Sequence, residues 1–394
     1  MKNKKILISG AGIAGLTLAY WLSKFGFEPV VVEKSPVPRT GGYMIDFFGV
    51  GVDVAERMGI LSDIEKEDPA IDELTFVNGQ GKRTGGLNIG KFKKVLDNRA
   101  YNILRSGLAN VIYNTVKDNI PIHFDTSIKS IVTDNNAVTV TFLDGTTDTY
   151  DLVIGADGLH SAVRTITFGE ESLFEKWHGY YTSSFTINNF LNTDRIFHTY
   201  TIPNKQASIY SQKGNKLVAF FVFRPTRQIH PDDQSVVSQK EILRAEFADA
   251  GWHCSQLLEG LSHTEDFYFD RVSQIKMANW SHGRISLVGD ACDCPSLLSG
   301  QGAALAMTGA YIVAGELKNA AGDYEVAFAR YQQIMMPFVS GKQKLAEKFA
   351  KSFVPKNQFN LWIRDTFVNL MFLPLVSKWF ANQFLRDNIT LKEY

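Results

Sequence analysis

The chain has 394 residues, of which 45% are apolar, 12% aromatic and 21% charged. This composition is typical of a globular protein, excludes disordered and fibrous architectures, and at this length predicts roughly two or three domains. Lysine plus arginine and aspartate plus glutamate number 41 each, so no overall positive charge exists to bind a nucleic acid. Cys292 and Cys294 lie too close in sequence for an ordinary disulfide, and 3 cysteines in all predict a reducing, cytoplasmic environment.

Two apolar stretches resemble targeting or membrane segments. Residues 6–21 follow several lysines, as in a signal peptide, but Gly10, Gly12 and Gly15 interrupt them and a second strand follows directly. Residues 366–384 contain asparagine, proline and lysine, each of which is costly inside a bilayer. We therefore predict no membrane span, and we expect the second stretch to be a packed amphipathic helix.

The chain opens with the pattern strand, turn, helix, strand. An apolar run over 4–9 ends in a glycine turn, apolar residues at helical spacing cover 14–25, and a buried strand covers 30–32. Because this unit builds a parallel sheet, it predicts an α/β fold.

The middle of the chain is predicted to contain short strands and single helices. A hairpin is expected over 72–83, a helix over 102–117, and one long helix over 239–258. Further strands are expected over 122–124, 128–133, 137–142, 147–150, 151–154 and 284–288. β-branched and aromatic residues dominate 176–223, which indicates a second domain inserted into the first. A helix of small residues over 302–317 returns to the first domain, and the remaining C-terminal residues are predicted to be helical.

The turn after the first strand carries the pattern Gly10-x-Gly12-x-x-Gly15. The first glycine permits the tight turn, the second lets the backbone approach a pyrophosphate, and the third lets helix and strand pack closely. Glu33 ends the next strand, where a carboxylate accepts hydrogen bonds from both ribose hydroxyls of an adenosine and repels a 2′-phosphate. Glycines used only for turns are the alternative. The pattern favours FAD or NAD over NADP as the tightly bound nucleotide.

Two further motifs favour FAD over NAD. The pair Asp157-Gly158 follows one buried strand, and the pair Gly289-Asp290 follows another. Asp290 can accept a hydrogen bond from a ribityl hydroxyl, and a helix that begins at Gly302 offers N–H donors to an electron-rich flavin edge. A plain dehydrogenase needs neither feature, so we predict FAD as the bound cofactor.

With these three motifs, residues 4–335 resemble the class A flavin-dependent aromatic hydroxylases, the para-hydroxybenzoate hydroxylase-like monooxygenases. The resemblance implies a small-molecule aromatic substrate, dioxygen, NADPH or NADH as a transient co-substrate, and oxygen transfer from a flavin C4a-hydroperoxide. It also implies that Arg39 and Arg105 contact FAD, and that the Asp157 motif with Arg164 takes part in FAD and NADPH binding. For Arg105 the alternative is a solvated charge on a helix.

The residues predicted to bind the cofactor come from all of these segments. They are Gly10, Gly12, Ala14, Gly15, Glu33, Lys34, Arg39, Asp46, Arg105, Asp157, Gly158, Arg164, Gly289, Asp290, Pro295, Gly300, Gln301 and Gly302. No catalytic side chain and no metal site is predicted, because in such enzymes the cofactor performs the difficult step. The 8 histidines, which include His160, His178 and His198, are assigned no role.

Three features narrow the resemblance to the tetracycline destructases: residues 41–46, the sequence Cys294-Pro295-Ser296, and an additional helical C-terminus. This narrower resemblance implies a large fused-ring phenol or enol that enters between the second domain and the C-terminal helices. The chain departs from the family at Asp293, where a histidine is usual, and at Ser296. Both changes alter the loop expected beside the flavin ring.

The predicted fold is therefore α/β, with a discontinuous Rossmann-like FAD-binding domain over 1–71, 99–173 and 267–335. A β-rich substrate domain is predicted over 72–98 and 174–266, and a C-terminal helical lid over 336–394. For the aromatic residues of this C-terminal segment the alternative is that they only cover apolar core. A monomer or weak dimer is expected.

Other functions stay open at this point. A flavin reductase or dehydrogenase has the same fold, a hydroxylase of this type could act on a smaller aromatic compound or polyketide, and a nucleotide-binding regulator would bind without turnover. An absorption spectrum of the purified protein, followed by NADPH oxidation with and without phenolic polyketides, would separate these functions.

Overall fold

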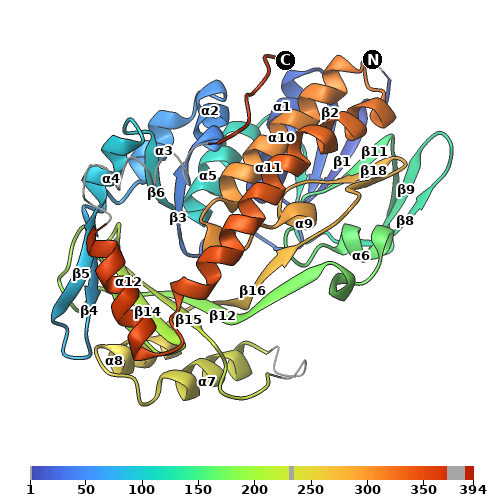
Figure 1. Ribbon diagram of the computed structural model, residues 1–394. Helices are drawn as coiled ribbons and strands as arrows, with labels where there is room; N and C mark the ends of the chain where they lie inside the picture. Colours follow the sequence, from blue (N-terminus) through green and yellow to red (C-terminus); the bar gives the residue numbers. More distant parts are fainter. Residues whose placement is uncertain (1, 230–234, 371–386) are drawn as a thin grey trace.

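Two large sheets, each with its own helices, form the frame of the molecule (Figure 1). The computed structural model describes residues 2–229, 235–370 and 387–394. The first sheet has the strand order β17-β18-β11-β1-β2-β7. Its strands are β1 (Lys5–Ser9), β2 (Glu28–Val32), β7 (Ile122–His123), β11 (Leu152–Gly155), β17 (Ser281–His282) and β18 (Ile285–Leu287).

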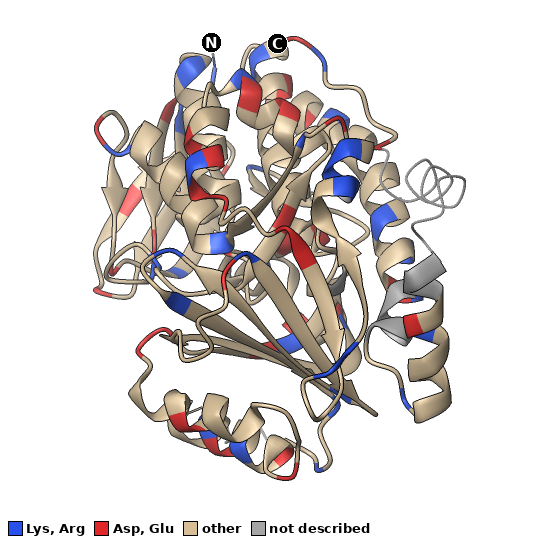
Figure 2. Cartoon of the chain, turned by 90° about the vertical axis from the view of Figure 1, so that its left-hand side faces the viewer, with Lys and Arg blue, Asp and Glu red and all other residues tan. Residues whose placement is uncertain are grey.

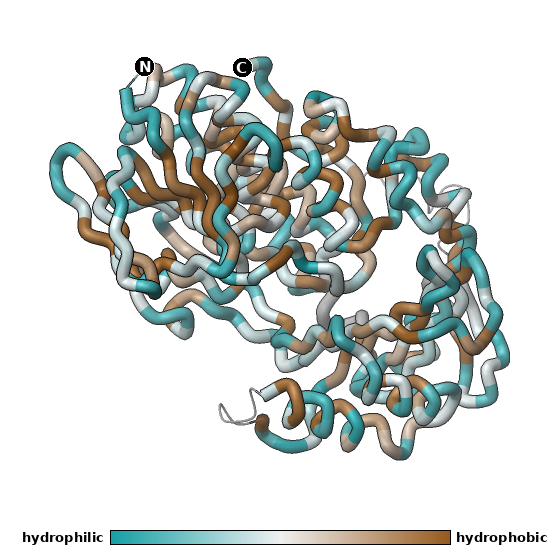
Figure 3. Tube along the Cα trace, turned by 180° about the vertical axis from the view of Figure 1, so that it is seen from behind, coloured by the Kyte–Doolittle hydropathy of each residue, from teal (hydrophilic) through white to brown (hydrophobic). Residues whose placement is uncertain are grey.

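Strand β1 lies in the middle of this sheet and pairs in parallel with β2 and β11. Ile6, Leu7 and Ile8 are all fully buried, as expected for a parallel strand with both faces covered. Figure 3 shows the strongly hydrophobic segments of this layer gathered in its interior. Because the parallel strands share one direction, their carboxyl ends meet at a single edge, where ligands bind in open sheets of this kind.

Helices α1 and α10 pack against each other beside this sheet, and α1 also packs against α5. The helices of this layer are α1 (Ile13–Lys24), α2 (Val50–Arg57), α3 (Leu61–Glu67), α5 (Arg105–Val116), α6 (Ala162–Phe168), α9 (Asp290–Asp293) and α10 (Gly302–Asn319). The small strand pair β3 (Met44–Phe48) with β6 (Ala100–Leu104) is antiparallel, and a three-stranded sheet consists of β8 (Ile128–Thr133), β9 (Val138–Phe142) and β10 (Thr147–Tyr150).

The second sheet has the strand order β16-β12-β15-β14-β13-β4-β5. Its strands are β4 (Glu73–Val77), β5 (Arg83–Asn88), β12 (Glu175–Asn188), β13 (Ile196–Ile202), β14 (Lys205–Gln212), β15 (Lys216–Phe223) and β16 (Tyr268–Ile275). One face packs Phe185 and Phe221 against α7 (Val236–Phe247) and α8 (Cys254–Gly260). The other face carries Tyr210 and Phe220 and packs against residues of the first layer such as Tyr43. Figure 2 shows these strands mostly tan, whereas the helices below them carry charges of both signs.

The C-terminal part of the chain connects the two layers. Helix α11 (Tyr324–Phe353) runs along α10 and continues to the second sheet, where α12 (Gln358–Leu370) packs against β5. Residues 387–394 lie back on the first layer, where the Tyr394 hydroxyl donates to Glu316 at 2.8 Å. Helix α11 passes residue 335 without a break, so the start of the lid at 336 stays a prediction, as does the division into domains.

Most of the expected elements are confirmed within a residue or two. The opening strand, helix and strand, the strands of the three-stranded sheet, the strand before Gly289 and the helix after Gln301 all form. The β-rich character of 176–223 is confirmed by four consecutive strands, β12 to β15. The expectation of an α/β fold with a Rossmann-like first domain, a β-rich second region and C-terminal helices is therefore correct.

Two expected helices are wrong in their extent. The helix predicted over 239–258 is two helices, because Trp252 adopts a φ of 59° and donates its backbone N–H to Gly79. The helix predicted over 102–117 begins only at Arg105, since the preceding residues form β6 and pair with β3. In both cases pairing with a distant segment overrides the local apolar spacing.

Within the described ranges, no helix is long and apolar enough to cross a membrane. Of the stretch 366–384, only 366–370 belongs to α12, and the rest lies outside the described residues.

Candidate functional site

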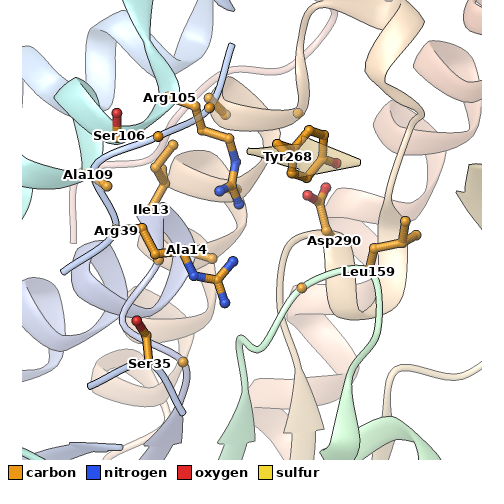
Figure 4. Close-up of a pocket in the computed structure, with 18 of the residues that line it drawn as sticks. Ile13, Ala14, Ser35, Arg39, Arg105, Ser106, Ala109, Leu159, Tyr268 and Asp290 are labelled. Carbon is orange, nitrogen blue, oxygen red and sulfur yellow. The ribbon is translucent and has the colours of Figure 1, made fainter. Parts of the chain in front are cut away.

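A cavity of about 560 Å³ lies at the carboxyl ends of β1 and β11 and extends toward the second sheet. The start of α1 and the residue after β2, Glu33, line one end of it, and Tyr43, Phe267 and Tyr268 line the other. Figure 4 shows Arg39 and Arg105 pointing into this space opposite Tyr268 and Asp290. One continuous space therefore joins the nucleotide motif to an aromatic wall.

The three motif glycines have different surroundings in the structure. Gly10 has a φ of 110°, and a Cβ there would lie 2.5 Å from the Ala156 carbonyl oxygen. A Cβ on Gly15 would overlap the Gly10 carbonyl oxygen, so this glycine serves helix packing and does not line the cavity. Gly12 has nothing within 4 Å of its Cβ position and borders the cavity, which leaves room for a ligand against the backbone.

Glu33 is oriented by backbone donors on both sides. Its Oε2 accepts from the Ala11 N–H at 2.9 Å and its Oε1 from the Ser35 N–H at 3.0 Å. The Arg39 guanidinium lies 3.5 Å from Oε1. Only 9% of Glu33 is exposed, yet it borders the cavity, so the carboxylate is held in place to accept further hydrogen bonds from a ligand.

Arg105 and Asp290 lie on opposite walls near the aromatic end (Figure 4). Burial raises the pKa of Asp290, and the charge of Arg105 opposes this rise. Burial disfavours the charge of Arg105, but nearby Tyr43 and Asp290 raise its pKa overall, so it stays a cation. Arg105 thus borders the cavity, which argues against a merely solvated helix charge.

Asp157 fixes the start of α6 beside the cavity. Its carboxylate accepts from the Ser161 hydroxyl at 2.5 Å and from the Val163 N–H at 3.1 Å. Gly158 follows with a φ of 83°, which only glycine adopts readily. Both residues line the cavity, so this motif shapes the wall through its backbone turn.

Most of the predicted cofactor residues come together in the cavity wall. They are Gly10, Gly12, Ala14, Glu33, Lys34, Arg39, Arg105, Asp157, Gly158, Asp290, Pro295, Gly300 and Gly302.

Five predicted residues do not line the cavity: Gly15, Asp46, Arg164, Gly289 and Gln301. Asp46 instead accepts from the Asn102 side chain at 2.7 Å. Gly289 turns the chain with a φ of 65° where a Cβ would lie 3.0 Å from Ala14. Gln301 is 7% exposed and directly precedes α10. These residues support the wall from behind.

Arg164 is the largest departure from the sequence-based assignment. It is completely buried, and its guanidinium donates to the Ala291 carbonyl at 2.9 Å and the Leu159 carbonyl at 2.6 Å. It also pairs with Glu171 at 2.7 Å. Arg164 therefore ties together the loops that follow β11 and β18, and its side chain has no access to a ligand in the cavity.

Sequence reasoning missed several aromatic and polar residues that the loops after β2 and β11 and the second sheet bring to the cavity. They include Tyr43, His160, Thr182, Phe267, Tyr268 and Asp270. The local signal at 266–270 is a run of three aromatic residues between two aspartates, which does not distinguish a cavity wall from an ordinary strand. Within the described part of the chain, no cluster of His, Cys, Asp and Glu is arranged to hold a metal ion.

The site fits an FAD molecule in its chemistry. The start of α1 offers backbone N–H groups and open space at Gly12 for a pyrophosphate. Glu33 offers an acceptor for ribose hydroxyls, and Asp290 offers one further along the same cavity.

Comparisons with known proteins agree with this chemistry. Residues 3–323 match a family model described as an FAD binding domain. A flavin-dependent monooxygenase of Legionella longbeachae serogroup 1 (strain NSW150) is 40% identical over 395 residues, covering 100% of this chain and 99% of that protein. The crystal structure of tetracycline destructase Tet(51) is similar with a TM-score of 0.85 and 35% identity, covering 100% of both chains. Klebsiella pneumoniae HpxO with FAD and uric acid is similar in fold, with a TM-score of 0.78 at 19% identity and 98% of each chain covered.

Proposed function

Because this chain belongs to the FAD-dependent monooxygenases of the aromatic-hydroxylase type, we propose that it hydroxylates a phenolic or enolic fused-ring substrate, with tetracycline inactivation as the leading case. The observation that carries this proposal is the continuous cavity from Glu33 through Asp290 to Tyr43, Phe267 and Tyr268. A nucleotide-sized slot that opens onto an aromatic wall suits a reaction between a bound flavin and a planar substrate.

The aromatic end supports a planar, acidic substrate. Tyr43 and Tyr268 have ring centroids 5.7 Å apart, and Tyr43 also packs against Phe220 at 5.9 Å. The guanidinium of Arg105 borders the same space. Aromatic faces stack on a fused ring, and a partly buried cation stabilises a phenolate or enolate oxygen, which makes the ring carbon richer in electrons.

When bound, FAD would supply the redox chemistry of the proposed reaction, namely electron uptake from NADPH or NADH and activation of dioxygen. Glu33 would hold the ribose hydroxyls of the adenosine, the start of α1 would hold the pyrophosphate, and Asp290 would accept from the ribityl chain. Arg105 orients the substrate oxygen. The protein's main task is to position the substrate carbon and to exclude water, since water releases hydrogen peroxide in place of product.

The proposal also covers the co-substrate, the C-terminal helices, and the location and oligomeric state of the protein. The nicotinamide nucleotide is proposed as a transient co-substrate, since the sequence contains only one Gly-x-Gly-x-x-Gly motif. The fused-ring aromatic substrate and dioxygen are the other partners. The helices from residue 336 onward act as a lid over the substrate entrance, and the protein works in the cytoplasm as a monomer or weak dimer. The similarity to the tetracycline destructase Tet(51) supports the substrate class.

The test is a turnover assay on the purified protein saturated with FAD. We expect NADPH and dioxygen consumption to rise on addition of a tetracycline, with a product 16 mass units heavier under normal dioxygen and 18 under ¹⁸O₂, as oxygen insertion requires. Asp290→Ala, which loses the ribityl acceptor, serves as the flavin-poor control. NADPH oxidation without oxygen insertion for any fused-ring phenol would favour the flavin reductase or dehydrogenase alternative. Oxygen insertion into small phenols, but not into fused-ring compounds, would indicate that the substrate is a simple aromatic compound.

A further inference from the structure

A chain of hydrogen-bonded side chains leads from the aromatic end of the cavity to the surface. The Tyr268 hydroxyl donates to Oδ2 of Asp270 at 3.3 Å, and Oδ1 of the same carboxylate lies 3.0 Å from Nε2 of His160. Nδ1 of His160 lies 2.9 Å from Glu171. All three of Tyr268, Asp270 and His160 border the cavity, and about half of the His160 side chain (51%) is exposed.

We propose that Tyr268, Asp270 and His160 form a proton path between the reaction cavity and solvent. This proposal deepens the proposed function, since it assigns proton supply to the same site, but it depends only on FAD chemistry with dioxygen and not on the identity of the substrate.

The reaction requires such a path because each turnover takes up one proton. NAD(P)H, dioxygen, a substrate C–H bond and one proton give NAD(P)⁺, a C–OH bond and one water molecule. The nicotinamide supplies two electrons, and dioxygen is divided between the product and water. Once flavin and substrate fill the cavity and displace its water, the proton must still reach the reacting oxygen, and side chains of the wall offer a route.

The chemical nature of each group suits its place in the path. Burial raises the pKa of Tyr268 well above its usual range, so its hydroxyl stays protonated and can accept one proton while it donates another. The hydrogen bonds to Asp270 and then Glu171 raise the pKa of His160 to about 10, so it carries a proton at neutral pH. The carboxylate of Asp270 lies between them with one oxygen toward each.

Transfer inward then proceeds in three balanced steps. The Tyr268 hydroxyl turns toward the cavity and gives its proton to the oxygen being reduced. His160 gives its Nε2 proton to Oδ1 of Asp270, and the protonated carboxyl group then rotates and gives this same proton to the Tyr268 oxygen. His160 regains a proton from solvent. The net result moves one proton to the oxygen being reduced and leaves every side chain unchanged.

The charges around the path are nearly balanced. Glu171 and the buried Arg164 form a pair on the outer side, with an N–O distance of 2.7 Å. On the cavity side, the charge of Asp270 acts on Tyr43, Tyr268 and Asp290, and that of Arg105 opposes it on Asp290. A proton in transit is therefore not trapped by a large net charge at either end.

The test measures reoxidation of the holoenzyme after its FAD is reduced with dithionite. In the absence of substrate, the reduced flavin anion, dioxygen and one proton give oxidised flavin and hydrogen peroxide, so neither NADPH nor an identified substrate is needed. Tyr268→Phe removes the hydroxyl that carries the proton, and Asp270→Asn removes the carboxylate that accepts it, each with little change of shape. At pH 8.5 we expect both to slow reoxidation by about 100-fold, the range of general acid catalysis, and added imidazole to restore the rate. His198→Gln, a histidine outside the cavity wall, is the matched control and should behave as wild type.

A second readout does not depend on flavin chemistry. The ring nitrogen signals of His160, followed by NMR in the full chain with and without FAD, should show an imidazolium that persists past pH 8, and Asp270→Asn should lower its pKa. Wild-type reoxidation rates in both variants, or slow rates that imidazole does not change, would overturn the path and leave only a structural contact. A His160 that titrates near its usual value in the wild type would overturn it independently. A protein without FAD would contradict the proposed function, while the NMR measurement still tests the path.

Discussion

Replacing Arg164 separates a scaffolding role from a role in cofactor binding. The sequence motif assigns this arginine to nucleotide binding, whereas in the structure it is fully buried between the Ala291 and Leu159 carbonyls and Glu171. We expect Arg164→Ala to destabilise the fold first, and to affect flavin chemistry only through loss of the folded protein.

The magnitude follows from the three contacts. Removing one partner of a buried ion pair costs about 3–5 kcal/mol, and each carbonyl that loses its donor costs about 1–3 kcal/mol when it stays buried. These costs overlap, and the Glu171 side chain is 27% exposed, so water screens part of the pair. We therefore expect a loss of about 3–4 kcal/mol in the free energy of unfolding.

The assay is urea unfolding followed by circular dichroism, with FAD content and the rate of flavin reduction by NADPH measured on the folded fraction. Arg164→Lys is the matched variant: it keeps the charge, but a single ammonium group cannot reach all three partners, so it should recover part of the stability. The reasoning would be refuted if Arg164→Ala unfolded at the wild-type urea concentration while flavin reduction fell. That result would indicate that Arg164 takes part in binding the nicotinamide nucleotide.

Four further outcomes are expected. Asp290→Ala should purify with little FAD, seen as loss of the flavin absorbance in the visible range. Retention of flavin would show that FAD binding does not depend on Asp290. Tyr394→Ala should lower the free energy of unfolding by about 2–4 kcal/mol, since it removes a ring packed on Tyr311 and a hydrogen bond to the buried Glu316; an unchanged urea midpoint would show that the C-terminal residues are not anchored there. The pKa of His160, about 10 when folded, lies above its usual 6.5, so its contribution to stability is complete below about pH 6.5 and is lost as pH rises toward 10. His160→Gln should flatten this part of the stability profile, and an unaltered profile would contradict the two carboxylate contacts. Deleting 357–394 should keep FAD binding, with the stability loss expected from the absence of Tyr394, yet uncouple NADPH oxidation to hydrogen peroxide. Failure to fold, where Tyr394→Ala still folds, would show that the segment covers core instead of acting as a lid.

The nucleotide end of the site could be predicted from the sequence because its determinants are local. Gly10, Gly12 and Gly15 act through backbone conformation and close approach within one turn, and Glu33 follows at the end of the next strand. Such short-range requirements fix residue types at fixed spacing, so they are visible without any tertiary structure.

Only the tertiary structure decided which side chains face the cavity. Arg164 and Arg105 both sit in recognisable motifs, yet one is enclosed behind the wall and the other borders the space, because the packing of distant loops determines their direction. Tyr268, Asp270 and His160 meet through contacts between segments more than 100 residues apart, as the 110-residue separation of Asp270 from His160 shows. No local pattern in the sequence predicts these contacts. Strand β16 lies beside the loop after β11 only because the second sheet packs against the first layer, and that packing depends on the total apolar surface that both layers bury.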